Sequence, residues 1–141
     1  MNERSSVSSR IRSWLWRLLR WAYAAYFIYV GCLVLNKLLH GTMTSYPQPN
    51  AAAQAFSDAL NASRFMNPAL VASYLGGGLA LLFQRTAPLG LAILGPPVAI
   101  ILLFHAVLTG MVYWGAGWAG AWLLMVWRYR KGFAPLWNYR D

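Results

Sequence analysis

His105 is the residue whose type and position most clearly suggest chemistry in this sequence. It lies in a long apolar segment, five residues before Gly110. At a rise of 1.5 Å per residue, its imidazole is about 7 to 8 Å inside the end of a predicted membrane helix. An ionisable side chain at that depth is a candidate binding group. The ring could hydrogen-bond to a quinone carbonyl, supply one axial nitrogen to a haem or chlorophyll metal, or bond to a neighbouring helix.

Three more polar residues, Asn36, Lys37 and His40, lie near the end of the first apolar segment. They fall on the same predicted side of the membrane as His105, so the four could form a polar ligand-binding pocket. Each alone is also explained by helix capping or by a side chain that reaches the membrane surface. The sequence leaves both interpretations open.

The pair Pro96 and Pro97 interrupts the apolar segment that contains His105. Two missing amide donors free the carbonyls of Ala92 and Ile93 and predict a kinked helix. Such a break is tolerated in a membrane where another helix, water or a ligand satisfies the backbone. The kink therefore indicates either a ligand pocket or a packing bend.

Catalytic and metal-binding motifs are missing from the sequence. It has no metal-ligand cluster, phosphate-binding loop, nucleophile elbow or pair of carboxylates, and Asp58 is the only acid away from the termini. These residues therefore give little basis for hydrolysis or phosphoryl transfer by this chain alone. We predict no catalytic residue and no metal site of its own, and the residues require no cofactor.

Composition points to lipid as the solvent. The chain is 59% hydrophobic and 11% charged, with a net charge of +9. Such a charge could indicate nucleic acid, but the cations cluster at the ends of apolar segments, which is typical of binding to anionic lipid headgroups. We predict no nucleic-acid partner. The predicted headgroup-binding residues are Arg10, Arg12, Arg17, Arg20, Arg128, Arg130 and Lys131.

Uncharged stretches predict four membrane-spanning helices in a single domain, because a crossing needs about 20 apolar residues. The predicted order is a basic segment (1–17), spans at 18–39, 68–84, 87–108 and 111–127, an outer loop (41–67) and a tail (128–141). The fold class is therefore an all-α membrane protein with a four-helix bundle.

Charge distribution predicts the orientation by the positive-inside rule. With the N-terminus in the cytoplasm, ten Lys and Arg residues are inside, and only Lys37 and Arg64 are outside. Both termini are then cytoplasmic, and we expect the inner membrane of a bacterium.

Two amphipathic helices are expected beside the spans. Residues 9–21 place Arg10 and Arg17 opposite Trp14 and Leu18, which predicts a helix along the inner membrane surface that bends into the first span. In the outer loop, residues 51–60 follow Asn50 with a helical apolar repeat and predict a short helix that caps the outer side. Asn67 and Thr86, each just before a proline-bearing first turn, predict capped helix starts.

Small and aromatic residues predict the helix contacts. Glycines let helix backbones approach closely, and the predicted packing positions are Gly76, Gly77, Gly78, Gly115, Gly117 and Gly120. On the fourth span, Trp114, Trp118 and Trp122 predict an aromatic ridge that faces lipid, a partner subunit or a pigment.

Short motifs distributed from about Tyr26 onward resemble the DoxX-like family of small four-helix membrane proteins. The matching pieces are the stretch from Tyr29-Val30-Gly31 through Asn36-Lys37-Leu38, residues 56–65, residues 77–82, Ala87-Pro88-Leu89-Gly90, Pro96-Pro97, Leu103-Phe104-His105 and residues 130–135. The chain has Tyr74 where the family commonly carries a glutamate. The family is named for a subunit of a quinol oxidase that couples thiosulfate oxidation to respiration, so the resemblance implies association with membrane redox machinery.

These observations lead to three hypotheses. The first is an accessory subunit that packs against a larger respiratory or photosynthetic electron-transfer complex. The second is a subunit that binds quinol or a small sulfur substrate between His105, Lys37 and the proline kink. The third, a small transporter, is disfavoured because the second and fourth spans carry no charged residue.

Overall fold

The computed structural model describes residues 2–42 and 44–137, and these residues form helices without a strand. The elements are α1 (Asn2–Leu39), α2 (Ala51–Ala62), α3 (Met66–Leu82), α4 (Ala87–Leu103), a π-helix η1 (Phe104–Thr109), α5 (Val112–Arg128) and α6 (Arg130–Trp137). The expected all-helical class is therefore confirmed.

Two stretches are long and apolar enough to cross a membrane, Arg10–Leu39 and Ala87–Thr109. The second combines α4 with η1. A third candidate is the pair α2 and α3, which passes the same test only when taken together and is bent by 88°. The structure thus supports a membrane protein with at least two helices of spanning length.

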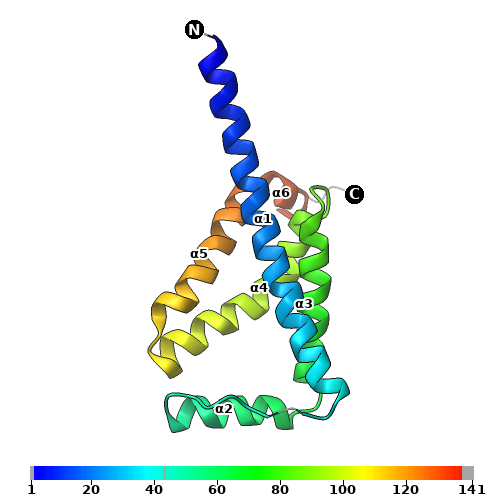
Figure 1. The fold of residues 1–141 in the computed structure, drawn as a ribbon, viewed down its shortest axis with the longest axis vertical. Coiled ribbons are helices and arrows are strands. Elements are labelled where there is room, and N and C mark those ends of the chain that lie inside the picture. Colours follow the sequence, from blue (N-terminus) through cyan, green and yellow to red (C-terminus); the bar gives the residue numbers. More distant parts are fainter. Residues whose placement is uncertain (1, 43, 138–141) are drawn as a thin grey trace.

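The long helices form an open bundle with α2 across one end (Figure 1). The helices α1 and α3 run side by side in opposite directions, while α4 slants away from them towards η1 and α5 leads back. The largest fully buried side chains of this core include Phe27, Leu81, Leu91 and Met125.

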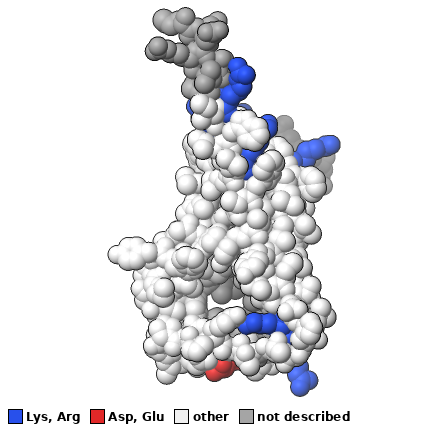
Figure 2. All heavy atoms as spheres, viewed as in Figure 1, with Lys and Arg blue, Asp and Glu red and all other residues white. Residues whose placement is uncertain are grey.

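The two ends of the bundle differ in charge (Figure 2). We call the end with Arg17, Arg20, Arg85 and Arg128 the basic end, and the end with α2 and Gly110 the loop end. Blue side chains gather mostly at the basic end. Arg140, one of the ten cations predicted to be cytoplasmic, lies outside the described residues.

The predicted bend between the basic segment and the first span is wrong. Instead, α1 is one continuous helix of 38 residues that projects beyond the rest of the bundle (Figure 1). The amphipathic pattern gave no reason for a break, because no proline or glycine occurs before Gly31. At 1.5 Å per residue, α1 is about 57 Å long, well beyond the hydrocarbon thickness of a bilayer.

Three of the six predicted packing glycines lie at close helix contacts. A Cβ on Gly77 would be 2.6 Å from Leu94 Cγ, one on Gly78 would be 3.2 Å from the Ala24 carbonyl, and one on Gly115 would be 3.0 Å from Leu102 Cα. At Gly76, Gly117 and Gly120, an added Cβ would meet nothing within 4 Å among the described residues. Packing within the chain therefore does not explain the second set.

Gly90, which was not among the predicted packing residues, makes the tightest backbone contact. An added Cβ would lie 2.7 Å from the carbonyl oxygen of Gly77 and 2.9 Å from the backbone nitrogen of Leu81. Because both neighbours are backbone atoms, they cannot move aside as a flexible side chain could. Gly77 and Gly90 therefore set the crossing of α3 and α4.

The aromatic ridge of α5 turns partly inward, which corrects the expectation of an outward-facing ridge. Trp118 stacks on Tyr26 of α1, with ring centroids 3.7 Å apart, and its carbonyl accepts a hydrogen bond from Tyr23. Trp122 donates from Nε1 to the Leu91 carbonyl at 2.9 Å. Of the three tryptophans, only Trp114 remains mostly exposed. The other two are partly covered because Trp118 packs on α1 and Trp122 packs on α4.

The short helix expected in the outer loop is confirmed as α2, and Asn50 caps it by accepting from the Ala53 backbone. The starts of α3 and α4 also agree with prediction to within about two residues, but neither predicted cap forms. Asn67 instead donates to Asn61, and Thr86 donates to the Ala80 carbonyl. The short helix α6 was not expected in the tail.

Candidate functional site

A cavity of about 400 Å³ lies at the loop end between α2, α3 and the joined α4 and η1. Its lining is mostly apolar, with Phe56 and Leu60 from α2, Leu70 from α3 and Phe104 from η1. The polar members are Gln48, Ser57, Tyr74 and His105. Cavities of this size, with few polar groups among many apolar ones, are typical of small-molecule sites.

The path of α4 creates this space. The helices α3 and α4 touch at the Gly77–Gly90 crossing, and α4 then slants away towards the loop end (Figure 1). Here α2 lies across the opening and contributes lining residues. The cavity therefore depends on one close crossing and on one covering helix.

Asn50 holds α2 in this position through both ends of its side-chain amide. Its oxygen accepts from Ala53 at 2.9 Å and caps the helix, while its nitrogen donates to the Leu108 carbonyl in η1. A second set of hydrogen bonds joins the loop to α2, where Asp58 accepts from Ser45 at 2.6 Å. The Asn50–Leu108 hydrogen bond therefore ties the start of α2 to η1, the element that carries His105.

His105 lies at the second residue of η1 and lines the cavity. Its Nδ1 atom is buried and has no hydrogen-bond partner among the described residues. A buried nitrogen left unpaired costs about 1 to 3 kcal/mol. A π-helical turn is also rare and often occurs at functional sites. Both features make His105 the strongest candidate for contact with a ligand.

Helix α5 fixes the position of His105 from the opposite side. A Cβ on Gly115 would lie 3.0 Å from both His105 Cβ and Leu102 Cα. Gly115 thus allows α5 to pack directly on the junction of α4 and η1. The imidazole is therefore positioned by backbone contact rather than by a hydrogen bond at Nδ1.

The structure does not bring the other predicted polar residues to His105. Lys37 lies over the ring of Tyr46, with Nζ 3.8 Å from the centroid, and His40 bonds through Nδ1 to the Asn36 carbonyl at 2.8 Å. None of Asn36, Lys37 and His40 lines the cavity. Their contacts are those of a helix end, and a ligand role for them stays a prediction.

The two prolines also lie apart from the cavity. The helix α4 continues through Pro96, which is exposed, and Pro97, which is buried. Trp122 packs over Gly95 and donates to the carbonyl of Leu91, one residue before the carbonyls that the prolines free. These contacts favour the packing interpretation of the proline pair over the pocket interpretation.

Tyr74 and Gln48 line the cavity in place of the predicted residues. In the sequence, Tyr74 stood out only as a departure from the DoxX-like pattern. No periodic signal could identify it, because α3 is apolar on nearly every face. Gln48 lies between two prolines in a loop, where side-chain direction has no sequence signature.

The cavity can hold an apolar molecule with one or two hydrogen-bonding groups. His105 and Tyr74 belong to its lining on different elements, η1 and α3, and most of the other lining residues are aliphatic or aromatic. The described residues contain no group of three or more His, Cys, Asp or Glu side chains that could hold a metal ion. His105 alone could supply one axial nitrogen to a haem or chlorophyll metal. Comparison of the chain with family models, curated proteins and solved structures finds no significant match.

Proposed function

We propose that the protein is a four-span membrane protein whose loop-end cavity binds a small, mostly apolar molecule of the quinone or quinol class. Two observations carry this proposal: His105 lines this apolar cavity, and its buried Nδ1 atom has no hydrogen-bond partner among the described residues. A ligand hydroxyl or carbonyl could complete the hydrogen bonding of that imidazole, in the tautomer that suits it.

The lengths of α3 and α5 support four crossings. Each has 17 residues, or about 26 Å of helix, close to the roughly 30 Å of a bilayer core. No charged residue occurs in α3, and Arg128 at the very end is the only one in α5. We further propose that both termini are cytoplasmic and that the membrane is a bacterial inner membrane, in line with the positive-inside rule.

Binding rather than catalysis is the role that this site supports. A quinol site with its own chemistry needs groups that accept protons and a partner that accepts electrons. Within the described chain, the cavity offers an imidazole and a phenol but no carboxylate. We therefore propose that any electron transfer takes place in a partner complex, which agrees with what the DoxX-like resemblance implies. The family comparison gives that resemblance no support.

The direct test measures the binding of a short-chain quinone analogue to the purified protein in lipid nanodiscs, with quenching of tryptophan fluorescence as the readout. We expect His105→Ala to weaken binding about tenfold, the effect of one lost hydrogen bond to a buried group. His40→Ala is the matched control, because His40 lies at the same end but outside the cavity. Equal affinity of wild type and His105→Ala would refute the proposal.

A second candidate function, an accessory subunit of a respiratory or photosynthetic electron-transfer complex, is favoured by one face of α5. Gly117 and Gly120 have open space beside them, and Trp114, Leu123 and Leu124 are exposed. Small residues on a lipid-exposed helix allow a partner helix to approach closely. Gentle extraction of native membranes and native electrophoresis would test it, since migration as a colourless monomer would count against this role.

A further inference from the structure

Arg20 is the most unusual charged residue of the described chain, because it is only 4% exposed. It lies on α1 at the basic end, where Nη1 donates to Gln84 Oε1 at 2.8 Å. Its Nε atom is buried and has no hydrogen-bond partner among the described residues. Burying a guanidinium without an opposite charge is expensive, so the position calls for a compensating group.

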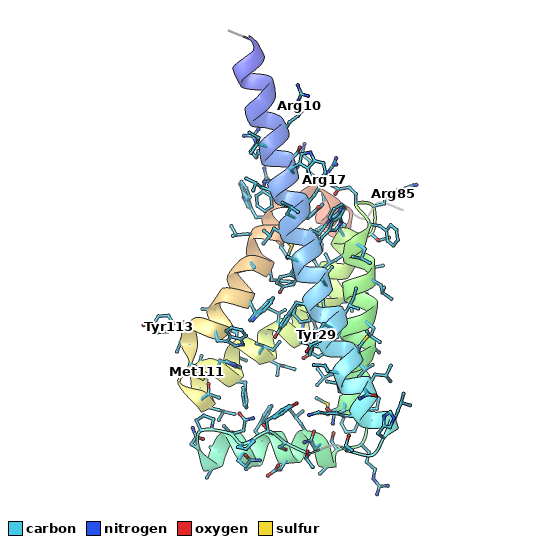
Figure 3. The ribbon with its side chains drawn as sticks, in the orientation of Figure 1. Arg10, Arg17, Tyr29, Arg85, Met111 and Tyr113 are labelled. Carbon is cyan, nitrogen blue, oxygen red and sulfur yellow. The ribbon has the colours of Figure 1, made fainter. Side chains whose placement is uncertain are left out.

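A cavity of about 350 Å³ lies beside this guanidinium. Its walls come from α1, the turn between α3 and α4, and the end of α5. Three arginines line it, Arg17, Arg20 and Arg128, together with the uncharged polar residues Gln84 and Tyr129. Figure 3 labels Arg17 and Arg85 at this end of the molecule. Three cations in one small space repel each other unless an anion lies between them.

The neutral groups of the cavity fix its shape without neutralising its charge. Gln84 Oε1 accepts hydrogen bonds from Arg20 and from the Tyr129 hydroxyl, the latter at 3.1 Å. Trp21 donates to the Leu82 carbonyl at 3.3 Å and holds α1 against the end of α3. The site is therefore built by contacts among three segments that are far apart in the sequence.

No acidic side chain among the described residues lines this cavity. Of the three acids in the chain, Asp58 lies on α2 at the loop end. Glu3 precedes Arg20 by seventeen positions on the same helix, or about 25 Å. Asp141 lies outside the described residues. The described part of the cavity therefore holds positive charge that its own residues leave uncompensated.

We infer that this cavity binds a phosphate-bearing anion between Arg17, Arg20 and Arg128. Guanidinium groups suit phosphate because their planar donors match its oxygens in charge and geometry. The phosphate can belong to an anionic phospholipid headgroup at the membrane surface or to a soluble phosphate ester. This site differs from the general attraction of exposed Arg10, Arg12 and Lys131 for headgroups, because Arg20 is desolvated and held by Gln84.

The test measures thermal unfolding of the full chain in neutral detergent, with phosphatidylglycerol, phosphatidylcholine or glycerol 3-phosphate added. A ligand that binds only the folded state raises the unfolding temperature. We expect phosphatidylglycerol to stabilise the wild type and phosphatidylcholine to have little effect. Arg20→Gln and Arg128→Gln should each lower the apparent affinity for phosphatidylglycerol at least fivefold. Arg128 is exposed, so its variant should fold even if the Arg20 variant does not.

Arg85→Gln is the matched control, because it removes the same charge at the same end from a residue outside the cavity. Stabilisation by glycerol 3-phosphate, with competition against the lipid, would identify a soluble ester as the ligand. Its absence alongside a lipid effect would identify the headgroup. Equal loss in the Arg85 and Arg128 variants, or no effect of any anion, would overturn the inference. Quinone binding at the loop end should be unchanged in all three variants, which separates the two proposals.

Discussion

The loop end and the basic end of this bundle carry cavities of similar size with opposite chemistry. The loop-end cavity, about 400 Å³, has a mainly apolar lining that includes His105, whose Nδ1 has no hydrogen-bond partner in the described part of the chain. The basic-end cavity, about 350 Å³, is lined by three arginines, one of which, Arg20, is buried. An unpaired buried polar nitrogen costs about 1 to 3 kcal/mol, whereas an uncompensated buried charge costs several. The comparison teaches that a compensating group should stabilise the basic end more than the loop end, and the two proposed ligands allow this difference to be tested.

The largest effect should come from the crossing of α3 and α4, which positions both ends. In Gly90→Ala, the new methyl group would meet backbone atoms at 2.7 and 2.9 Å. We expect a loss of about 2 to 3 kcal/mol in the free energy of unfolding, because the backbones must separate. Detergent-denaturant unfolding measures it, and both ligands should bind more weakly.

The control for this crossing is Gly76→Ala, since an added Cβ there meets no described atom within 4 Å. Its stability should be equal to or above that of the wild type, because alanine favours helix. If Gly90→Ala were as stable as Gly76→Ala, the close crossing of α3 and α4 could not be what positions the two ends of the bundle.

A smaller effect, confined to the loop end, is expected for Gly115→Ala. The added carbon would lie 3.0 Å from His105 Cβ and from Leu102 Cα. We expect a loss of about 1 to 2 kcal/mol in stability and several-fold weaker quinone binding, because the imidazole is displaced. Phosphatidylglycerol binding should stay at the wild-type value. Gly117→Ala, on the open face of α5, serves as the comparison, and a matching loss of quinone binding there would contradict this account.

The smallest effect is expected for Lys37→Met. The ammonium of the half-buried Lys37 lies 3.8 Å from the centre of the exposed Tyr46 ring, a cation–π contact worth about 0.5 to 1 kcal/mol. Since Lys37 does not line the loop-end cavity, quinone affinity should not change. Tyr46→Leu should lose a similar stability, and the double variant should lose little more. If Lys37→Met lowered quinone affinity as much as His105→Ala, the result would instead support the polar pocket of His105 and Lys37 that the sequence suggested.

Segments with strong local signals were predicted well. Residues 51–60 after Asn50 correspond to α2 (Ala51–Ala62), and the stretch 87–108 corresponds to Ala87–Thr109. Capping residues, prolines and uncharged length are local properties, so they can be read without knowing the neighbours. The continuity of α1, the π-helix and α6 were missed. A π-helical turn has no sequence signature as clear as a capping residue, and a single extra residue within an apolar helix is enough to form one.

The candidate sites were predicted only in part. His105 stood out because an imidazole is rare in an apolar helix. The arginines of the basic end stood out because many cations cluster at the ends of apolar segments. Which residues join them depended on the angle between helices. Tyr74, Gln48 and Gln84 come from segments far from their partners in the sequence. Because α3 and α4 are apolar on nearly every face, their sequences do not show which face of each helix points into the bundle.

The sequence by itself determined that the chain is helical and apolar enough for a membrane, with its positive charge at one end. These properties follow from composition and from the order of charged and uncharged segments. The tertiary structure alone decided that Trp118 and Trp122 pack inward, that Gly90 marks the closest crossing and that Arg20 is buried. The physical reason is that an apolar helix can present any face to its neighbours, and close packing of backbones selects one.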